Sequence, residues 1–388
     1  MSRLDPCDVV VVGGGLAGLL AADRLQRSGA SVVLFDEAPG PVASSGRSLG
    51  IVSAGFVDSP WRLKAGLGER TARGLSFWSS LAVQSLTRTA AELGVPIEAT
   101  GTWHAALDQQ EKEEWVESAR LLRDWGIAET RVAHASELSE LGLPGAIAGA
   151  VHVAGGGSLD VGAFMQALAA RFFEAGGRCL SGHSVTLDER QGAPVALVGD
   201  QALECELAVV AAGASAPSVH PFFGSCVYPV RLQGQRLEAA QVTGARIPAA
   251  PVLARHRFEA WGRERDGGLG FVGSRWAEQP EMEAGVTEDT SVSGKVSEKQ
   301  DAFLAERLGV STEARRDRWT GIVAYTCDGL PILGPLPGAP KVIGLVGWSG
   351  WGLALMAQAV DEVTAAILGE DPPGGAGTPS WLVARRLI

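Results

Sequence analysis

The first part of the chain alternates apolar runs with a glycine-rich turn. Residues 8–12 (Asp-Val-Val-Val-Val) are β-branched and apolar after the first position, which is typical of a buried parallel strand. Glycines at 13–18 break this run, residues 16–27 have the composition of a helix that Gly29 ends, and residues 31–35 form a second apolar run. This order predicts a β-α-β unit at the start of the chain.

Further helices and strands follow from the same kind of pattern. Asp160 is suited to cap the start of a helix. Apolar residues recur behind it at helical spacing, at Val161, Phe164, Met165, Leu168 and Phe172. Helices are also expected at 70–93, 109–125 and 353–368, and strands at 178–187, 194–199, 207–212 and 342–347.

The middle of the chain has a different periodicity. Residues 226–276 alternate apolar and polar positions with frequent glycine, which favours an antiparallel sheet. The polar stretch 277–301 is expected to be a surface loop that leads to a helix. The chain therefore combines a β-α-β pattern with a separate antiparallel one.

Composition narrows the class of protein. The 388 residues are 46% hydrophobic and 20% charged, which indicates a globular chain with a sizeable core. A net charge of −11 argues against nucleic acid or an anionic membrane as a partner. The five cysteines lack paired spacing and the six histidines lack metal-binding spacing, so we expect reduced thiols, a cytoplasmic location and no metal site. Neither a membrane span nor a secretory signal is expected.

The turn at 13–18 has the G-x-G-x-x-G spacing of a dinucleotide-binding cradle. Gly13 permits a tight turn, Gly15 lets the backbone approach a pyrophosphate, and Gly18 lets helix and strand pack closely. Asp36 ends the second strand, where its carboxylate can accept hydrogen bonds from ribose hydroxyls, and an acid there argues against NADP. The motif leaves FAD and NAD open, and a glycine-rich turn that binds nothing is the alternative.

Five later segments carry a resemblance to a known family. They lie at 45–53, 207–215, 229–235, 326–335 and 347–352. Together with the first β-α-β unit, and in this order, they resemble the D-amino-acid oxidase superfamily of FAD-dependent oxidoreductases. The glycine oxidase and sarcosine oxidase branch is the most similar, and the resemblance extends over nearly the whole chain.

The resemblance implies an α/β fold with two interleaved domains. A Rossmann-like FAD-binding domain with a central parallel sheet would comprise residues 1–65, 151–225 and 319–388. An α+β substrate domain built on an antiparallel sheet would comprise residues 66–150 and 226–318.

The resemblance also implies the cofactor and the residues that bind it. FAD would be held without a covalent bond, because the family's linking cysteine falls near Gly321. The helix that begins after 347–352 would direct its positive end at the flavin's pyrimidine edge. The implied FAD-binding residues are Gly13, Gly15, Leu16, Ala17, Gly18, Asp36, Glu37, Ser44, Ser45, Arg47, Ser48, Val185, Ala212, Gly213, Gly347, Ser349, Gly350, Trp351, Gly352 and Leu353.

The substrate side departs from the family. Val323 stands where many relatives hold the substrate carboxylate with an arginine. Gly350 and Ala354 stand where the glycine oxidase and sarcosine oxidase branches place an arginine or a lysine. Phe271 stands in place of the branch's oxygen-activating lysine. The implied flavin site is therefore kept, whereas the implied substrate site is not.

A few residues remain as candidates for the substrate site. Arg275 and Tyr325 are the candidate catalytic residues, although a solvated arginine at a strand end is the alternative for Arg275. Trp348 and Val323 are the candidate substrate contacts, with core packing as the alternative for Trp348.

The implied activity is oxidation of a C–N bond in a small amine or amino-acid-like substrate, by hydride transfer to flavin N5. Oxygen or an electron carrier would then accept the electrons. Two alternatives stay open: a flavin dehydrogenase of a 2-hydroxy acid or another alcohol, and a flavin-binding partner protein whose redox site has drifted.

Overall fold

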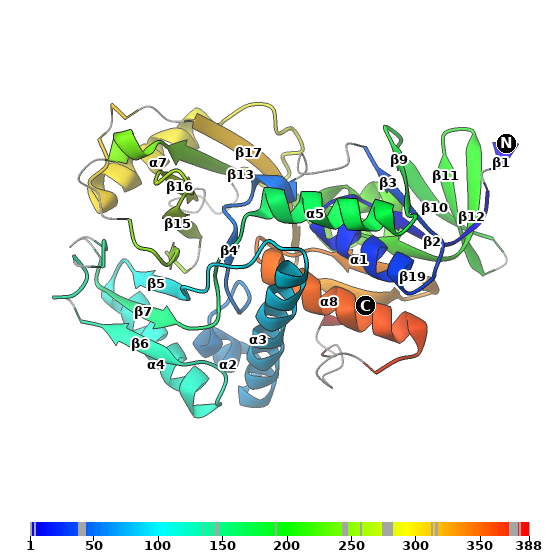
Figure 1. Ribbon diagram of the computed structural model, residues 1–388. Helices are drawn as coiled ribbons and strands as arrows, with labels where there is room; N and C mark the ends of the chain where they lie inside the picture. Colours follow the sequence, from blue (N-terminus) through cyan, green and yellow to red (C-terminus); the bar gives the residue numbers. More distant parts are fainter. Residues whose placement is uncertain are drawn as a thin grey trace.

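Two large β-sheets organise the protein (Figure 1). The computed structural model describes residues 2–3, 5–37, 44–134, 136–139, 141–143, 147–190, 192–242, 247–256, 258–273, 282–311, 313–314, 317–371, 379 and 382–387. In the view of Figure 1 the nine-stranded sheet lies on the right and the eight-stranded sheet on the left. None of the helices in these ranges is long and apolar enough to cross a membrane.

The nine-stranded sheet contains the predicted β-α-β unit. Its parallel strands run in the order β19 (Ala339–Val346), β12 (Gln201–Val210), β2 (Cys7–Val12), β3 (Val32–Asp36) and β9 (Arg178–Ser181). The remaining strands are β1 (Ser2–Arg3), β10 (Val185–Arg190), β11 (Ala193–Val198) and β18 (Ile332–Leu336). The strand expected at 178–187 is wrong in one respect, because residues 182–184 interrupt it and divide it into β9 and β10.

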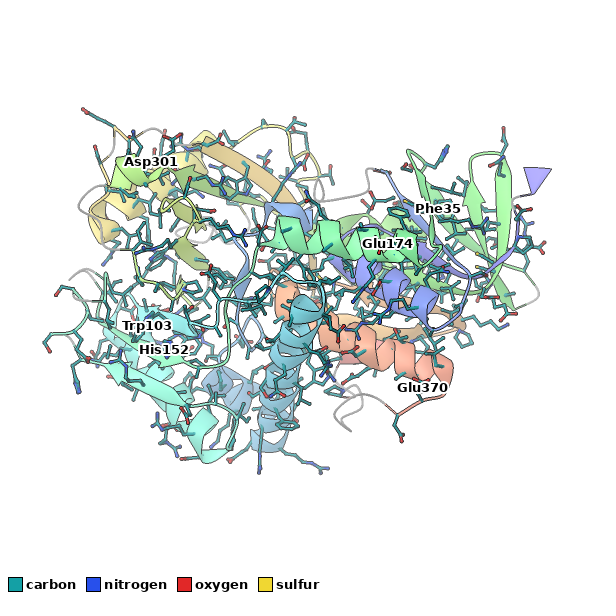
Figure 2. All side chains as sticks on the ribbon, viewed as in Figure 1. Phe35, Trp103, His152, Glu174, Asp301 and Glu370 are labelled. Atoms are coloured by element: carbon teal, nitrogen blue, oxygen red, sulfur yellow. The ribbon has the colours of Figure 1, made fainter. Side chains whose placement is uncertain are left out.

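Alternating side chains of this sheet fill two cores. Val9, Val11 and Leu34 pack on the side of α1 (Leu16–Arg27), with α3 (Glu69–Glu92), α5 (Val161–Glu174) and α8 (Gly352–Leu368). Val10 and Phe35, which is labelled in Figure 2, pack on the opposite side. Burial on both faces explains why these strands are continuous apolar runs.

The helix expected behind Asp160 is confirmed. The Asp160 carboxylate accepts a hydrogen bond from the backbone N–H of Ala163 at 2.9 Å, which caps α5. All five apolar positions predicted to share a face are buried.

The eight-stranded sheet is antiparallel except where β14 pairs with β5. Its order is β17 (Asp317–Thr326), β13 (Val227–Leu237), β16 (Leu269–Val272), β15 (Glu259–Arg263), β14 (Val252–Ala254), β5 (Thr102–Ala106), β7 (Gly149–Val153) and β6 (Thr130–Ala133). Three helices accompany it: α2 (Pro60–Leu67), α4 (Gln109–Asp124) and α7 (Gly294–Leu308). Trp103 of β5 and His152 of β7 lie edge to face, with ring centroids 4.9 Å apart (Figure 2).

The two sheets draw their strands from interleaved parts of the chain, as the sequence suggests. The boundary expected at residue 319 falls inside β17, which pairs with β13 over its whole length. Helix α3, expected in the second domain, packs against α8, and the Trp78 indole donates to the Glu362 carboxylate at 2.7 Å. The division into an FAD-binding and a substrate domain stays a prediction.

Candidate functional site

The glycine-rich turn links β2 to α1, and its three spaced glycines differ in what surrounds them. Gly13 has φ of +109°, and a Cβ there would lie 2.5 Å from the Ala211 carbonyl oxygen. A Cβ on Gly18 would overlap the carbonyl oxygen of Gly13. At Gly15 the only described atom within 4 Å of such a Cβ is Ser45 Oγ, at 3.5 Å. The fold itself therefore requires Gly13 and Gly18, whereas Gly15 faces open space.

Polar groups surround this open space. The Ser45 hydroxyl accepts a hydrogen bond from the Leu16 N–H at 3.2 Å, and the Asp36 carboxylate accepts one from the Gly14 N–H. Ser45 belongs to the short 3-10 helix η1 (Ser44–Arg47). Free N–H groups at a helix N-terminus attract phosphate, and the carboxylate at the end of β3 is placed for ribose. These residues fit the adenosine diphosphate part of a dinucleotide.

The other residues expected along the cofactor occupy varied environments. Gly213 follows β12 with φ of +54°, next to the Ala212 turn. The Val185 side chain is buried in the core, so only its main chain could meet a ligand. Glu37 accepts a hydrogen bond from the Ser184 hydroxyl at 3.1 Å, and Ser48 accepts one from the Gly50 N–H.

The turn at 347–352 leads into α8 and is fixed to β17. Gly347 and Gly350 have positive φ, and Ser349 also has φ of +49°. The Ser349 N–H donates to the Ala324 carbonyl at 3.0 Å. A Cβ on Gly350 would lie 3.7 Å from the Tyr325 hydroxyl oxygen. Tyr325 and the N-terminal end of α8 are therefore neighbours, as a shared site requires.

The aromatic candidates near this turn differ in exposure. Trp348 is 7% exposed and belongs to the core on the α1 side of the nine-stranded sheet, whereas Trp351 and Leu353 are half-buried at its border. The Tyr325 ring lies against Tyr228, with centroids 6.1 Å apart. The candidate Arg275 lies outside the described residues.

The two faces of the eight-stranded sheet have different neighbours. On one face, Gln233 Nε2 donates to Ser297 Oγ of α7 at 2.8 Å. On the other face, Leu49 lies against Gly270, and Arg47 Cδ lies 3.8 Å from a Cβ placed on Gly321. Because side chains alternate along a strand, Val323 shares the face of Gly321. We call this surface the loop face, because residues 47–49 cross it.

Phe271 does not lie on the loop face. It pairs with Gln235 and packs with Phe303 of α7, whereas Gly270 and Val272 point the other way. Phe271 therefore does not share the face of Arg47 and Gly321, and the expectation that it replaces a flavin-facing lysine stays a prediction. Because side chains alternate along β16, the Phe271 side chain points into the core beside α7, opposite to those of its two neighbours.

A cavity of about 200 Å³ lies where α2, α4 and the turn between β14 and β15 meet. One row of paired residues runs across the sheet from Trp319 through Gly234 and Val272 to His104. Trp115 of α4 stacks on His104, with ring centroids 3.8 Å apart. The cavity is lined by Val57, Asp58, Ser59, Arg62, Glu114, Trp115, His256 and Phe258. We call this the Arg62 pocket.

The polar wall of the Arg62 pocket is a linked set of charges. Arg62 Nε donates to the buried Glu114 carboxylate at 2.8 Å, and Arg62 Nη2 lies 3.1 Å from His256 Nδ1. His256 has φ of +49°, and its N–H donates to the Glu111 carboxylate at 2.6 Å. This strained turn holds the imidazole beside Glu114.

The pKa values of Glu114 and His256 move apart. Burial alone would raise the pKa of Glu114, but hydrogen bonds from His256, Arg62 and Ser59 outweigh it and lower this pKa to about 2. The hydrogen bond to Glu114 raises the pKa of His256 despite partial burial. The ionised carboxylate and the protonated imidazole therefore stabilise each other.

We expect Glu114→Gln to destabilise the protein most between about pH 4.5 and 6.5. The stability from Glu114 is present above its unfolded pKa of 4.5 and is lost as pH falls towards 2. The stability from His256 is present below its unfolded pKa of 6.5 and is lost as pH rises through the raised folded value. The lowering of the Glu114 pKa corresponds to about 3 kcal/mol, measurable by urea unfolding at several pH values.

Glu113, the exposed residue next to Glu114, supplies the control for this prediction. Glu113→Gln changes the same charge on α4 and should shift stability by no more than about 0.5 kcal/mol at any pH. A difference between the two variants that does not depend on pH would contradict the pairing of Glu114 with His256.

Sequence reasoning missed Arg62, Glu114 and His256. They come from α2, α4 and the turn between β14 and β15, separated by as many as 194 positions. None of them belongs to a motif, and each alone is an ordinary polar residue. Only the pairing of the strands brings them together.

A comparison with protein families gives a match over most of the chain. The family described as DAO, FAD dependent oxidoreductase, matches residues 8–365. No curated protein matches the chain.

Several solved structures share the fold at low identity. Glycine oxidase from Geobacillus kaustophilus is 20% identical with a TM-score of 0.81, and all of both chains is covered. L-proline dehydrogenase from P. horikoshii is 16% identical with a TM-score of 0.77, covering 99% of this chain and 98% of that chain. L-amino acid deaminase from Proteus myxofaciens, in complex with anthranilate, is 16% identical with a TM-score of 0.77, covering 100% and 95%. The chain therefore belongs to the DAO family of FAD-dependent oxidoreductases.

Proposed function

We propose that this FAD-dependent oxidoreductase oxidises a C–N bond of an amine or amino-acid-like substrate larger than glycine. The proposal is supported by the place of Gly321, Val323 and Tyr325 on one face of β17. The row of strand pairs on that face leads to His104, on which Trp115 of the Arg62 pocket stacks. The solved relatives include a glycine oxidase, an L-proline dehydrogenase and an L-amino acid deaminase, all of which act on amino acids.

FAD, when bound, would supply the acceptor for a hydride from the carbon next to the substrate nitrogen. Ser45, Asp36 and the N-terminus of α1 would hold its nucleotide end, as their open geometry allows. Tyr325 lies beside the turn at Gly350, where its hydroxyl can orient a substrate. Arg62 and His256 line the Arg62 pocket, where a polar group of a longer substrate would be held.

The size requirement follows from the sheet. The Arg62 pocket and Val323 are separated by several strands, and neighbouring strands lie about 4.8 Å apart. A molecule as small as glycine cannot contact both. An extended amine that lies along the loop face can.

A dehydrogenase acting on a 2-hydroxy acid or another alcohol is the second candidate. The residues of β16, Leu269–Val272, contain no lysine to assist reaction with oxygen, which favours an electron carrier as acceptor for either substrate. We place the enzyme in the cytoplasm, because its five cysteines are all unpaired thiols.

Product analysis separates the two candidates. Oxidation of a C–N bond gives an imine that water converts to a carbonyl compound and a free amine or ammonia. Oxidation of an alcohol gives the carbonyl compound alone. We expect about one released amine or ammonia per flavin reduced under anaerobic conditions, and a carbonyl product without released nitrogen would favour the dehydrogenase.

The turn at 347–352 should strengthen the binding of sulfite to the flavin. The N-terminus of α8 carries a partial positive charge that favours an anion near Gly350. Replacing Gly350 with Asp should weaken sulfite binding to the flavin by roughly 2- to 30-fold, the range that corresponds to 0.3–2 kcal/mol. Loss of the flavin's visible absorbance on titration with sulfite measures this.

Gly350→Asn is the matched control for that change. It imposes the same strain at φ of +87° without the charge. Equal sulfite affinity in the two variants, with FAD bound in both, would show that this helix end does not act on the flavin.

A further inference from the structure

Arg47 and Asp289 meet at the open edge of β17. Arg47 Nη1 donates to the Thr320 carbonyl at 2.8 Å and to the Asp289 carboxylate. The Thr320 hydroxyl donates to the Asp289 carbonyl. Among the strands that the structure describes, β17 is the last of its sheet, so the Thr320 carbonyl at its edge can receive Arg47. The contacts join η1, β17 and the segment at 282–293.

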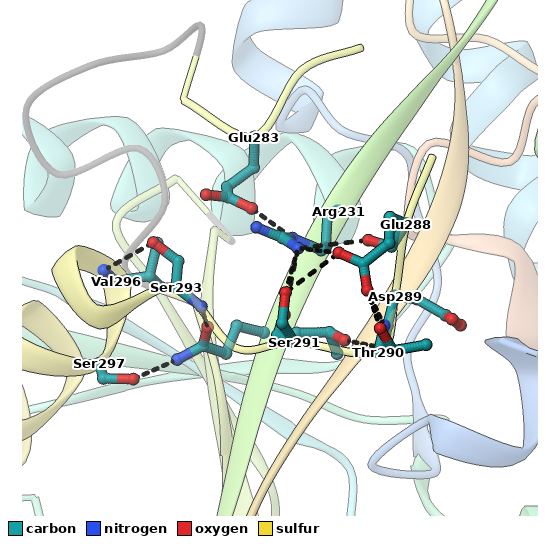
Figure 3. A network of polar contacts seen from close by, with 11 residues as sticks. Arg231, Glu283, Glu288, Asp289, Thr290, Ser291, Ser293, Val296 and Ser297 are labelled. Atoms are coloured by element: carbon teal, nitrogen blue, oxygen red, sulfur yellow. Dashed lines mark hydrogen bonds and ion pairs between the residues drawn. The ribbon is translucent and has the colours of Figure 1, made fainter. Parts of the chain in front are cut away.

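Contacts with Arg231 of β13 also hold the segment at 282–293 in place (Figure 3). Arg231 of β13 donates to the Glu283 carboxylate, and its Nη1 contacts the Glu288 and Ser291 carbonyls at 3.2 and 3.1 Å. Arg231 and Glu283 are each only 11% exposed. Asp289 therefore approaches Arg47 from a fixed position, whereas Glu283 and Glu288, the acids that precede it, are already engaged by Arg231.

The space beside Arg47 is open on the loop face. Gly321 has no side chain, and the only described atom within 4 Å of a Cβ placed there is Arg47 Cδ. Val323 lies two residues further along the same face, roughly 6.6 Å away. Arg47 and Asp289 are 32% and 37% exposed, so their ion pair is weak enough for another carboxylate to compete with it.

We propose that Asp289 determines the substrate selectivity of this enzyme by occupying Arg47. The internal carboxylate holds the guanidinium at the strand edge. A ligand carboxylate must displace Asp289 to pair with Arg47 over Gly321, whereas an amine without a carboxylate meets no such competition. The proposal rests on the proposed function only in placing the substrate on the loop face.

Anthranilate is a suitable probe, because it is a carboxylate that binds a solved relative. The FAD-loaded protein is titrated with anthranilate, and the change in flavin absorbance gives the dissociation constant. We expect Asp289→Asn to tighten binding roughly five-fold, the upper range for an exposed ion pair. Higher salt should reduce the difference between wild type and variant.

Two controls test whether the change in binding comes from the ion pair between Arg47 and Asp289. Glu288→Gln changes the net charge of the same segment equally but acts on Arg231, so binding should change less than about two-fold. In an Arg47→Gln background, Asp289→Asn should have no effect. Equal changes in the Asp289 and Glu288 variants, or no tightening in Asp289→Asn, would overturn the proposal.

If the Asp289→Asn variant loses FAD, a second variant tests the same proposal. Thr320→Val removes the hydroxyl that holds the Asp289 carbonyl and should tighten anthranilate in the same direction, by less. Unchanged or weaker binding there would count against the proposal. The titration needs no turnover, so failure of the proposed amine oxidation would appear separately, as a flavin that no amine reduces.

Discussion

Gly15→Val should give a folded, colourless protein. Gly15 has φ of −66°, which any residue adopts, and a Cβ there meets only Ser45 Oγ at 3.5 Å among the described atoms. The added side chain fills the space in front of the α1 N-terminus, where the pyrophosphate is expected to bind. Wild type should carry about one non-covalent FAD per chain, which acid precipitation releases, and the variant almost none.

Gly18→Ala is the contrasting variant for this prediction. Its Cβ would overlap the Gly13 carbonyl, so helix and strand must separate and the fold itself should weaken. Flavin absorbance and thermal unfolding of the apoprotein distinguish the two variants. Retention of FAD by Gly15→Val would show that the cofactor does not use this cradle.

Val323→Arg should create activity towards small amino acids. Val323 is half-buried on the loop face and pairs with the buried Val230. Among the described residues, the cation next along this face is Arg47, which Asp289 already holds, so a small substrate carboxylate placed at Val323 lacks a partner of opposite charge. A charged hydrogen bond from the new guanidinium contributes about 1.5–3 kcal/mol, or roughly 10- to 160-fold in kcat/KM for glycine, sarcosine or D-alanine.

Val323→Met tests whether charge causes this gain. It adds a long side chain at the same place without a cation, and activity on glycine should stay at the wild-type level. A gain with Met equal to that with Arg would mean that pocket shape limits the wild type. No gain with Arg, in a protein that binds FAD, would place the substrate carboxylate elsewhere.

The features that the sequence predicts well are local. The turn at 13–18, Asp36 and the helix capped by Asp160 each depend on residues within one or two elements. Their spacing therefore carries enough information to place them. The segments that match the family are likewise short, and their order along the chain identifies the fold.

The features that the sequence does not predict depend on strand pairing. Which face Phe271 occupies follows from its register with β13, and a shift of one residue would reverse it. The Arg62 pocket joins three elements, and Asp289 reaches Arg47 across 242 positions. No local pattern distinguishes these charges from solvated ones.

Anaerobic reduction of the flavin by a panel of compounds tests the central claim most directly. The panel contains glycine, sarcosine and D-alanine, larger amines and amino-acid derivatives, and 2-hydroxy acids, with flavin absorbance followed in time. We predict rapid bleaching by one or more of the larger amines, slow bleaching by the three small amino acids and none by hydroxy acids. Bleaching by glycine or sarcosine as fast as by any larger amine, or by no amine at all, would contradict it.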